Sequence, residues 1–422
     1  WYDLETFGIH SSLDRIAQYA AIRTDGSFEP LEEPTVLYCK ITPDYVPDPK
    51  ACLITGITPK VTLEKGIPEF EFISRINEQF SKPGTCVVGF NNLNFDDEFV
   101  RQTLYRNLHD PFYREWAHGN SRWDIINMLR AARDLRPQGI EWPQKEDGTP
   151  SFKLEHLTEA NGIPHEAAHD ALSDVHATIS MARLVYETQP KLFRYLYELR
   201  KKEKVKELID LHEKPILLYS SEVLTSPQGC TAPVLPVAAD PHNHNAVLCY
   251  DLRQDPRELL ELPVAAIKER LFTPESQLPE GVDRIPLVKL QVNKAPAVSP
   301  LSVLDEGAAD RLGIDIEKVQ ERAGEIRKRH EITQKVMEVF RREQASRRRD
   351  PELEIYQGFF PDSDKEKMGE VRQEEPQEML RRRFEFEDPR VPPLIWRLVC
   401  RNYPEALDEE TRTQWRSFCA GR

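Results

Sequence analysis

Two carboxylates stand two residues apart at the start of the sequence, in the segment YDLETFG (residues 2–8). Successive side chains of a β-strand point to opposite faces, so residues i and i+2 share one face. If this segment is a strand, Asp3 and Glu5 lie side by side, and the repulsion between their charges costs energy unless a cation lies between them. A polar strand edge or a turn facing solvent is the alternative, so the pair needs partners elsewhere in the chain.

The chain divides into three parts of different pattern. Residues 1–189 carry strand-like and helix-like segments, which predicts an α/β domain with a mixed sheet flanked by helices. Residues 190–349 carry short strand-like runs broken by Pro, Asn and Asp, which predicts a small, mainly β domain with helical flanks. Residues 350–422 have a helical pattern. A length of 422 residues fits two or three domains.

Composition narrows the class of protein. The sequence is 39% hydrophobic and 30% charged, and no apolar run approaches the ~20 residues of a membrane span. No basic start followed by an apolar core is present, so we expect neither a signal peptide nor a membrane partner. The seven cysteines are scattered without CxxC spacing, which fits a reduced, cytoplasmic compartment and argues against structural zinc. The net charge of -14 argues against a surface coated in basic residues, although a narrow groove can still be locally basic.

A third candidate carboxylate lies in GFNNLNFDDE (residues 89–98). It follows a short apolar run, residues 85–91, which we expect to be a buried strand. Asp96 would then stand after a loop at the start of a helix, aimed across the sheet at the opening pair. We expect its neighbour Asp97 to point to solvent.

The segment HDALSD (residues 169–174) adds a histidine and a fourth carboxylate. Asp170 suits the cap of the helix that follows, which would leave His169 on the loop before it. Asp174 would project from the first turns of that helix. A second possible cap is Asp124, at the start of another predicted helix.

Four carboxylates in one pocket cannot all stay ionised without cations. Two Mg²⁺ ions about 4 Å apart, or Mn²⁺ in their place, would neutralise them and bind a phosphodiester between them. One ion would lower the pKa of a bound water, the second would stabilise the leaving 3′-oxygen, and His169 would take the proton from the attacking water. The predicted chemistry is metal-assisted hydrolysis of a phosphodiester.

The ordered set of DxE, Asn-x-x-Phe-Asp and HxxxxD resembles the DEDDh branch of the DEDD superfamily of 3′→5′ exonucleases. The similarity is closest to the bacterial exonuclease I family and covers most of the chain. Further segments that carry it are LDRIAQYAAIRTD (13–25), LITGITP (53–59), NSRWDIINMLRA (120–131), GTPSFKLEHLTEANGI (148–163), IPLVKLQVNKAP (285–296) and YQGFFPDSDKEKM (356–368).

The resemblance implies an RNase H-like exonuclease domain (1–189), an SH3-like β-barrel domain (190–349) and a helical C-terminal domain (350–422). It implies degradation of single-stranded DNA from the 3′ end to nucleoside 5′-monophosphates with Mg²⁺, in DNA repair. It also implies a monomer that binds the acidic C-terminal tail of single-stranded DNA-binding protein. The C-terminal end is shorter than is usual in the family, so we expect the third domain to be incomplete.

The resemblance also assigns residues. The metal ligands would be Asp3, Glu5, Asp96 and Asp174, with His169 as the general base. Contacts with the DNA would come from Glu5, Lys153, Arg101, Trp116 and Arg130. Lys153 stands where the family commonly has Arg; Lys keeps the charge but loses the bidentate fork, so we expect a weaker contact there.

Basic and aromatic residues interleave between residues 100 and 124. This pattern is typical of a surface that grips a single strand by backbone charge and base stacking. Packing into an ordinary core is an equal alternative for Trp123, and a weaker one for Trp116.

Two other functions stay open on the sequence. A DEDDh ribonuclease acting on RNA 3′ ends shares the whole catalytic set, because sugar preference depends on 2′-OH contacts that motifs do not reveal; the second and third domains argue against it. A DNA-repair scaffold that binds through basic clusters, such as residues 341–350, is disfavoured because all five catalytic positions are intact. Those clusters also fit a solvated helix face or a linker.

Overall fold

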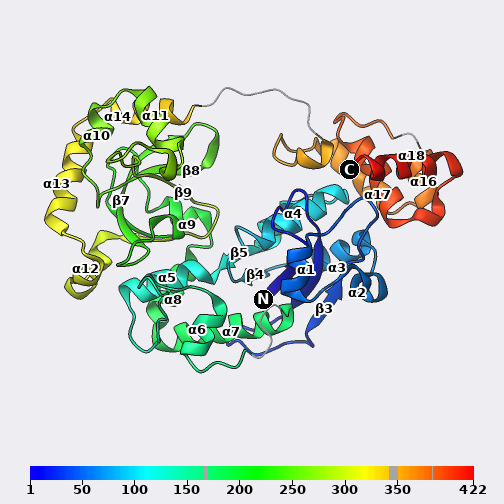
Figure 1. Cartoon of the computed structure of the whole chain (residues 1–422), viewed down its shortest axis with the longest axis horizontal. Helices are drawn as coiled ribbons and strands as arrows, with labels where there is room; N and C mark the ends of the chain where they lie inside the picture. The colour runs from blue at the N-terminus through cyan, green and yellow to red at the C-terminus, as the bar shows by residue number, and fades with distance from the viewer. Residues whose placement is uncertain (166–169, 342–349, 383) are drawn as a thin grey trace. The chain divides into compact units, whose positions relative to one another are not determined.

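The computed structural model describes residues 1–165, 170–341, 350–382 and 384–422 (Figure 1). The chain folds as two compact units that interleave in sequence. The first unit comprises Trp1–Arg122, His165–Ile179 and Ser346–Arg422, and the second comprises Trp123–Pro164 and Ser180–Ala345. The third sequence segment therefore belongs to the same unit as the first.

The first unit contains an antiparallel sheet with the strand order β1-β2-β3. Its strands are β1 (Tyr2–Thr6), β2 (Ile16–Ala21) and β3 (Thr35–Tyr38). Along β1, Tyr2 and Leu4 point into the apolar core. The alternating residues Asp3 and Glu5 therefore share the opposite face of the strand. The prediction of a strand with both carboxylates on one face is confirmed.

Strand β4 (Cys86–Gly89) lies close to β1. A Cβ atom added at Gly89 would be 3.1 Å from the carbonyl oxygen of Tyr2 and 2.7 Å from Cβ of Asn92, so only glycine fits where the two strands meet. Strand β5 (Ser121–Asp124) pairs with β4. The buried strand expected at residues 85–91 is thus present, and the loop after it leads directly into the next helix.

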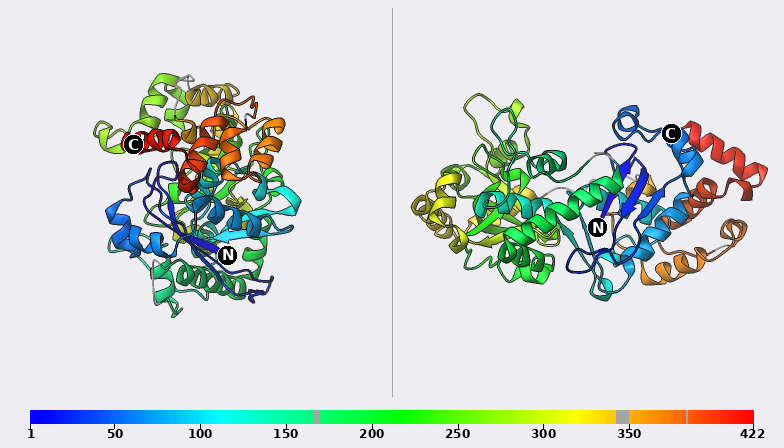
Figure 2. Two further views of the ribbon diagram at one scale, coloured as in Figure 1. Left: turned by 90° about the vertical axis from the view of Figure 1, so that its right-hand side faces the viewer. Right: turned by 90° about the horizontal axis from the view of Figure 1, so that it is seen from below.

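Two helices cover the apolar face of this sheet, α3 (Glu69–Ser81) and α4 (Asp96–Arg106). In α3, apolar residues recur at helical spacing, and the sequence thereby predicts an apolar stripe on one face of the helix. The stripe, Phe72, Ile73, Ile76 and Phe80, is buried in one core with Tyr2 and Leu4. Figure 2 shows the blue strands and the neighbouring blue helices together in both further views. The remaining helices of this unit are α1 (Pro49–Thr55), α2 (Pro59–Lys65), α15 (Asp362–Val371), α16 (Pro376–Arg381), α17 (Val391–Asn402) and α18 (Glu409–Ala420).

Buried ion pairs and a hydrogen bond connect helix α17, near the end of the chain, with residues of the first sequence segment and with Glu352. Arg401 of α17 lies 2.7 Å from carboxylate oxygens of both Asp44 and Glu352, and these side chains are almost fully buried. Asn402 accepts a hydrogen bond from the backbone N–H of Phe70 at 2.9 Å. Because α3 begins after a proline that offers no side-chain cap, Asn402 supplies the N-cap interaction from the far end of the sequence.

The second unit contains a five-stranded antiparallel sheet in the order β10-β6-β7-β8-β9. The strands are β6 (Leu217–Ser220), β7 (Thr231–Asp240), β8 (Asn243–Asp251), β9 (Leu287–Gln291) and β10 (Ala297–Pro300). The helices of this unit are α5 (Ile125–Leu135), α6 (Leu154–Ala160), α8 (Pro190–Glu198), α9 (Lys202–Lys206), α10 (Arg257–Glu261), α11 (Val264–Phe272), α12 (Glu306–Leu312), α13 (Ile316–Arg327) and α14 (Ile332–Phe340).

Helix α7 (Ala171–Thr188) begins in the first unit and ends in the second. The domain boundaries expected at residues 189 and 349 stay predictions. Across the residues that the structure describes, none of the helices is both long and apolar enough to cross a lipid bilayer.

Replacing Arg401 with Ala should destabilise the first unit by about 3 kcal/mol, because the buried carboxylates Asp44 and Glu352 would lose their nearest cation. The longer pairs that Arg15 and Arg422 form with the same two carboxylates would remain. Urea unfolding of the variant and the wild type measures the loss. Arg381→Ala is the control, since Arg381 forms an exposed pair with Glu378 that should be worth about 1 kcal/mol or less. Equal losses in the two variants would contradict the role of the buried pairs.

Candidate active site

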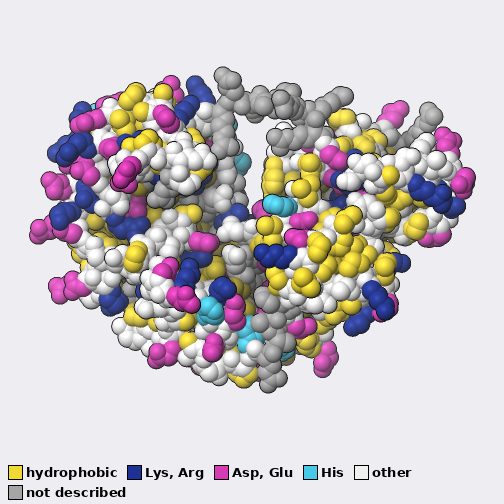
Figure 3. All heavy atoms as spheres, in the orientation of Figure 1, with side chains coloured by type: hydrophobic (Ala, Val, Ile, Leu, Met, Phe, Trp, Pro, Cys, Tyr) yellow, Lys and Arg dark blue, Asp and Glu magenta, His cyan; other side chains and the backbone are white. Residues whose placement is uncertain are grey.

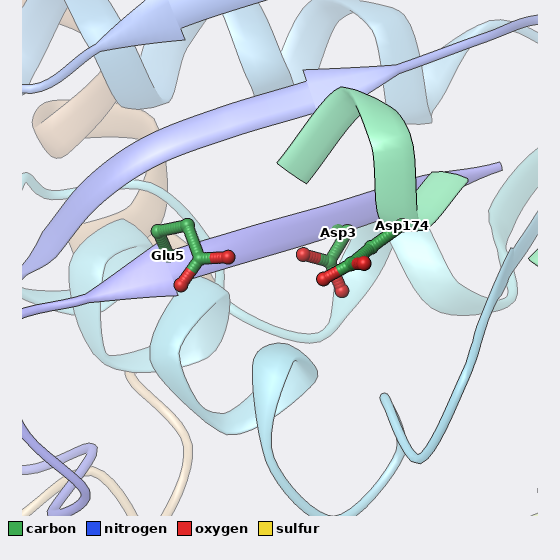
Figure 4. A group of neighbouring side chains, drawn as sticks. All are labelled: Asp3, Glu5 and Asp174. Atoms are coloured by element: carbon green, nitrogen blue, oxygen red, sulfur yellow. The ribbon is translucent and has the colours of Figure 1, made fainter. Parts of the chain in front are cut away.

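Three of the predicted ligands meet on the polar face of β1. One carboxylate oxygen from each of Asp3, Glu5 and Asp174 lies within 4.8 Å of the other two. Strand β1 supplies the first two, and the first turn of α7 brings Asp174 over them (Figure 4). The structure therefore joins two sequence segments about 170 residues apart into one acidic group, as the motif order predicts.

Asp96 is the first residue of α4 and is buried. It lies outside the group of three whose ligand atoms are all within 4.8 Å of each other. Its charge nevertheless acts on both Asp3 and Glu5 and raises the pKa of each. The fourth predicted ligand thus faces the same site, although the other three are closer together.

Two carboxylates of this site, Asp3 and Glu5, resist ionisation. Burial is the largest cause that raises the pKa of Asp3 well above its usual value, although part of its side chain stays exposed, and the charges of Asp96 and Asp174 add to it. Burial, followed by the charge of Asp174, raises the pKa of Glu5 to about 8. A divalent cation among these groups would remove the cause of their mutual repulsion.

The donor set fits a hard divalent cation. All the candidate ligand atoms are carboxylate oxygens, which suit Mg²⁺, Ca²⁺ and Mn²⁺ better than softer metals. The group in Figure 4 comes from a strand and a helix, which hold ligands more firmly than loops do. On donor chemistry and charge, the residues present fit the metal ions expected from the sequence.

His169, the predicted general base, lies outside the described residues. The structure instead brings another histidine to the site: Nε2 of His165 lies 2.5 Å from Oδ1 of Asp174. The sequence analysis missed this residue. The available signal was a second histidine in the same segment, four positions before His169.

The expectation that Asp97 points to solvent is wrong. Its side chain is fully buried and accepts hydrogen bonds from the Tyr2 hydroxyl at 3.0 Å, from Arg114 at 2.9 Å and from Arg122. Burial alone would raise the pKa of Asp97, but the two guanidinium groups outweigh it and hold this pKa below its usual range. The arginines follow in a later segment, so a local pattern could not reveal them.

The two carboxylates assigned to helix caps do cap helices. Asp124 accepts a hydrogen bond from the backbone N–H of Ile126 at 3.0 Å, at the start of α5. Asp170 accepts one from the backbone N–H of Ser173 at 3.2 Å, at the start of α7. Both interpretations are confirmed.

Three of the residues expected to contact DNA lie in the first unit: Glu5, which belongs to the acidic group, and Arg101 and Trp116. Arg101 is buried and its guanidinium is held by Glu115 at 2.7 Å and by Glu98 at 2.7 Å. Trp116 is 66% exposed, with its ring edge-to-face against Tyr113 at 5.4 Å. Trp116 is therefore available for stacking on a base, whereas Arg101 is already paired with carboxylates.

The other two lie in the second unit, with Trp123. Arg130 bonds Oδ1 of Asn127 at 2.8 Å, and Lys153 is exposed 3.5 Å from Glu155. Trp123 is buried with its ring 5.1 Å from that of Phe193, so core packing is the correct interpretation for Trp123. The DNA contacts of Glu5, Arg101, Trp116, Arg130 and Lys153 stay predictions.

The face drawn in Figure 3 carries basic side chains scattered among acidic and hydrophobic ones. This mixture agrees with the net charge of -14. A uniformly basic coat for nucleic acid is absent from the described residues on that face, so the grip on a polyanion must depend on local groups.

Models of three protein families match the chain. Residues 1–182 match the exonuclease family, residues 200–342 the exonuclease I SH3-like domain, and residues 349–422 the exonuclease I C-terminal domain. The chain is 42% identical to exodeoxyribonuclease I of Escherichia coli (strain K12) over 416 residues, which cover 98% of this chain and 87% of that protein. It is 40% identical to exodeoxyribonuclease I of Haemophilus influenzae, over 99% of this chain and 89% of that protein.

Solved structures agree with the sequences. Exonuclease I from Methylocaldum szegediense matches with a TM-score of 0.95 and 47% identity, over 99% of this chain and 88% of that one. E. coli exonuclease I in complex with a dA16 oligonucleotide matches with a TM-score of 0.97 and 42% identity, over 100% and 90%. The zinc-bound form of the E. coli exonuclease I–ssDNA complex matches with a TM-score of 0.96 and 41% identity, over 100% and 89%.

These matches confirm the predicted fold class, an RNase H-like exonuclease domain followed by SH3-like and C-terminal domains. They also confirm the enzyme class, since the relatives are exodeoxyribonucleases over nearly the whole chain. With three family models in order and identities of 40% and more, the chain belongs to the exonuclease I family.

Proposed function

We propose that the protein removes nucleotides from the 3′ end of single-stranded DNA by metal-assisted hydrolysis. The observation that carries the proposal is the group of Asp3, Glu5 and Asp174 in a member of the exonuclease I family. Each of the three offers a carboxylate oxygen within 4.8 Å of those of the other two. Solved relatives with TM-scores of 0.96 and 0.97 hold single-stranded DNA. The ribonuclease alternative is not favoured, because the curated relatives are exodeoxyribonucleases.

Divalent metal ions are part of the proposal. Asp3, Glu5, Asp96 and Asp174 would hold two Mg²⁺ ions, with Mn²⁺ as a substitute. When bound, such ions neutralise charge at the scissile phosphate and activate a water as the nucleophile. The zinc-bound E. coli relative supports a divalent cation, and the all-oxygen donor set suits a hard cation such as Mg²⁺ or Mn²⁺.

The protein's own residues supply positioning and proton transfer. Glu5 of β1 and Asp96 of α4 are buried, so neighbouring atoms restrict the positions of their carboxylates. The contact of His165 with Asp174 restrains the orientation of that carboxylate. His169 would accept the proton of the attacking water, because an imidazole with an ordinary pKa of about 6.5 exchanges protons near neutral pH.

Substrate contacts follow the same proposal. The exposed indole of Trp116 offers a stacking surface for a base, and the exposed Lys153 offers positive charge in the second unit. Arg130 is buried and lies 3.4 Å from Glu222, so its contact with DNA is proposed on the family resemblance alone. Glu5 would also touch the terminal nucleotide. Binding of the acidic tail of single-stranded DNA-binding protein, a monomeric state and a cytoplasmic location remain expectations from the family resemblance.

The proposal is tested by incubating the protein with single-stranded DNA, the matching duplex and the matching RNA, each with Mg²⁺ or EDTA. We expect nucleoside 5′-monophosphates to be released from single-stranded DNA when Mg²⁺ is present and not when EDTA is present. The duplex and the RNA should not be cleaved at a comparable rate. Equal or faster cleavage of RNA would move the assignment to the ribonuclease alternative. No cleavage of any substrate would leave the scaffold alternative.

His169→Ala should lower kcat by about 10²–10⁴-fold, because the attacking water loses its proton acceptor. The KM for single-stranded DNA should change little, since the residue acts on the reacting water. Single-turnover cleavage measures both. The control is His176→Ala, which removes an exposed histidine from α7; a similar loss of kcat in both variants would refute the assignment of His169.

The increase in the stability of the folded protein that Mg²⁺ causes should become larger as the pH rises. The pKa of Glu5 is about 8 in the folded metal-free protein, against an ordinary value of 4.5. Between these values the folded state binds more protons than the unfolded state, so this group lowers the free energy of unfolding as the pH increases. The rise in Tm on replacing EDTA with Mg²⁺ should therefore be larger near pH 8 than near pH 5.5.

The control for this effect is Glu5→Gln, which removes the titrating group. In EDTA near pH 8 it should be more stable than the wild type, whereas below about pH 4.5 the two should be similar. A metal-induced rise in Tm that is the same at both pH values would contradict the electrostatic account of the site.

Trp116→Ala should weaken binding of single-stranded DNA by about 1–3 kcal/mol, because a base loses its stacking partner. Fluorescence anisotropy in EDTA measures binding without cleavage. An oligonucleotide with abasic sites is the matched control, since it has no base to stack. A loss of affinity that is equal for the normal and the abasic strand would show that Trp116 does not act by stacking.

A further inference from the structure

We propose that Tyr2 and Asp97 are positioning residues for the catalytic carboxylates. The hydrogen bond between them joins the strand that carries Asp3 and Glu5 to the helix that carries Asp96. This inference rests on the proposed function, because it concerns the spacing of the carboxylates that would hold the metal ions. It gives a role to a fully buried aspartate that the sequence pattern placed in solvent.

Tyr2 and Asp3 are neighbours on β1 with side chains on opposite faces. The ring of Tyr2 lies in the core, edge-to-face against Phe80 at 5.0 Å, and the residue is 2% exposed. Its hydroxyl donates a hydrogen bond to Oδ1 of Asp97 at 3.0 Å. Asp97 follows Asp96 in the first turn of α4. One hydrogen bond therefore connects the immediate neighbours of two candidate metal ligands.

Asp97 is itself held from two further directions. Nη2 of Arg114, in the 3-10 helix Tyr113–Glu115, donates to Oδ1 at 2.9 Å. Nη1 of Arg122, in β5, donates to Oδ2. The side chains of Asp97 and Arg114 have no exposed surface, and that of Arg122 is nearly buried. A carboxylate with three protein donors on two oxygens has little freedom to turn.

The arginines are paired with further carboxylates of the same unit. Glu115 lies 2.9 Å from Arg122 and 2.7 Å from Arg101, and Arg101 also lies 2.7 Å from Glu98. Across the described residues of this network, three acidic side chains, including Asp97, face three arginines. The charges are thus balanced within the protein, and the network links β1, α4, the 3-10 helix and β5.

Spacing matters because the metal-holding carboxylates come from separate elements. Small displacements of groups that act together lower catalysis strongly, and partners of metal ligands typically change metal affinity or activity by about 10–100-fold when they are removed. The bond from Tyr2 to Asp97 fixes β1 to the first turn of α4 on the side away from the site. Loss of this hydrogen bond should therefore change the spacing of the carboxylates and lower their affinity for metal ions.

The test uses two tyrosines of the same sheet. Tyr2→Phe removes only the hydroxyl that reaches Asp97. Tyr19→Phe is the control, because Tyr19 of the neighbouring strand is equally buried and its hydroxyl donates to Gln79 at 2.8 Å, outside the Asp97 network. Titration of each full-length protein with Mn²⁺, without DNA, by isothermal calorimetry measures metal affinity, and thermal unfolding measures stability.

Tyr2→Phe should weaken Mn²⁺ binding by about tenfold, while Tyr19→Phe should stay within about twofold of the wild type, and the two should have similar Tm values in EDTA. The kcat of Tyr2→Phe on single-stranded DNA should be low at limiting Mn²⁺ and recover at excess, with KM for DNA unchanged. A merely structural defect would lower Tm and would not be rescued by metal.

Two negative results are distinguishable. Equal Mn²⁺ affinities for Tyr2→Phe and Tyr19→Phe, with normal binding by the wild type, would overturn the positioning role and leave the proposed function intact. A wild-type protein that binds no Mn²⁺ and does not cleave DNA would overturn the proposed function, and the positioning role with it.

Discussion

Repulsion between like charges is the constraint on which the first unit depends. Asp3, Glu5 and Asp174 are held within 4.8 Å of one another, and burial and neighbouring charge raise the pKa of the first two. Such a group persists only if the elements that carry it are fixed by other interactions. On the opposite face of β1 those interactions are an apolar core and a set of buried ion pairs, in which the carboxylate of Asp97 is fully compensated.

Two adjacent aspartates show how environment assigns roles. Asp96 adds negative charge beside the carboxylates of Asp3 and Glu5 and raises the pKa of both, whereas Asp97 lies among guanidinium groups that hold its pKa low. The residue type is the same and the positions are consecutive. The difference follows from the helix, because successive residues point about 100° apart around its axis. One turn of α4 therefore serves both the site and the structure that supports it.

The C-terminal segment is part of the same support. Arg401 and Asn402 are remote in sequence from the strand that carries the site, yet they pair with Asp44 and cap α3 through Phe70. Helix α3 in turn packs on the back of β1. The stability of the strand that carries Asp3 and Glu5 thus depends on residues of the third segment, which explains why that segment belongs to the first unit rather than forming a unit alone.

The sequence by itself determined the strand with Asp3 and Glu5 on one face, the stripe of α3, the caps Asp124 and Asp170, and the family, because each depends on local periodicity or on the order of short motifs. It left the tryptophans undecided: Trp116 is exposed and Trp123 buried. Only the tertiary structure decided that Asp97 is buried, that His165 reaches Asp174 and that Arg101 is already paired. Asp97 bonds a tyrosine 95 residues away, and Arg101 also bonds Tyr356, 255 residues away. A local pattern carries no information about which distant groups the fold brings together.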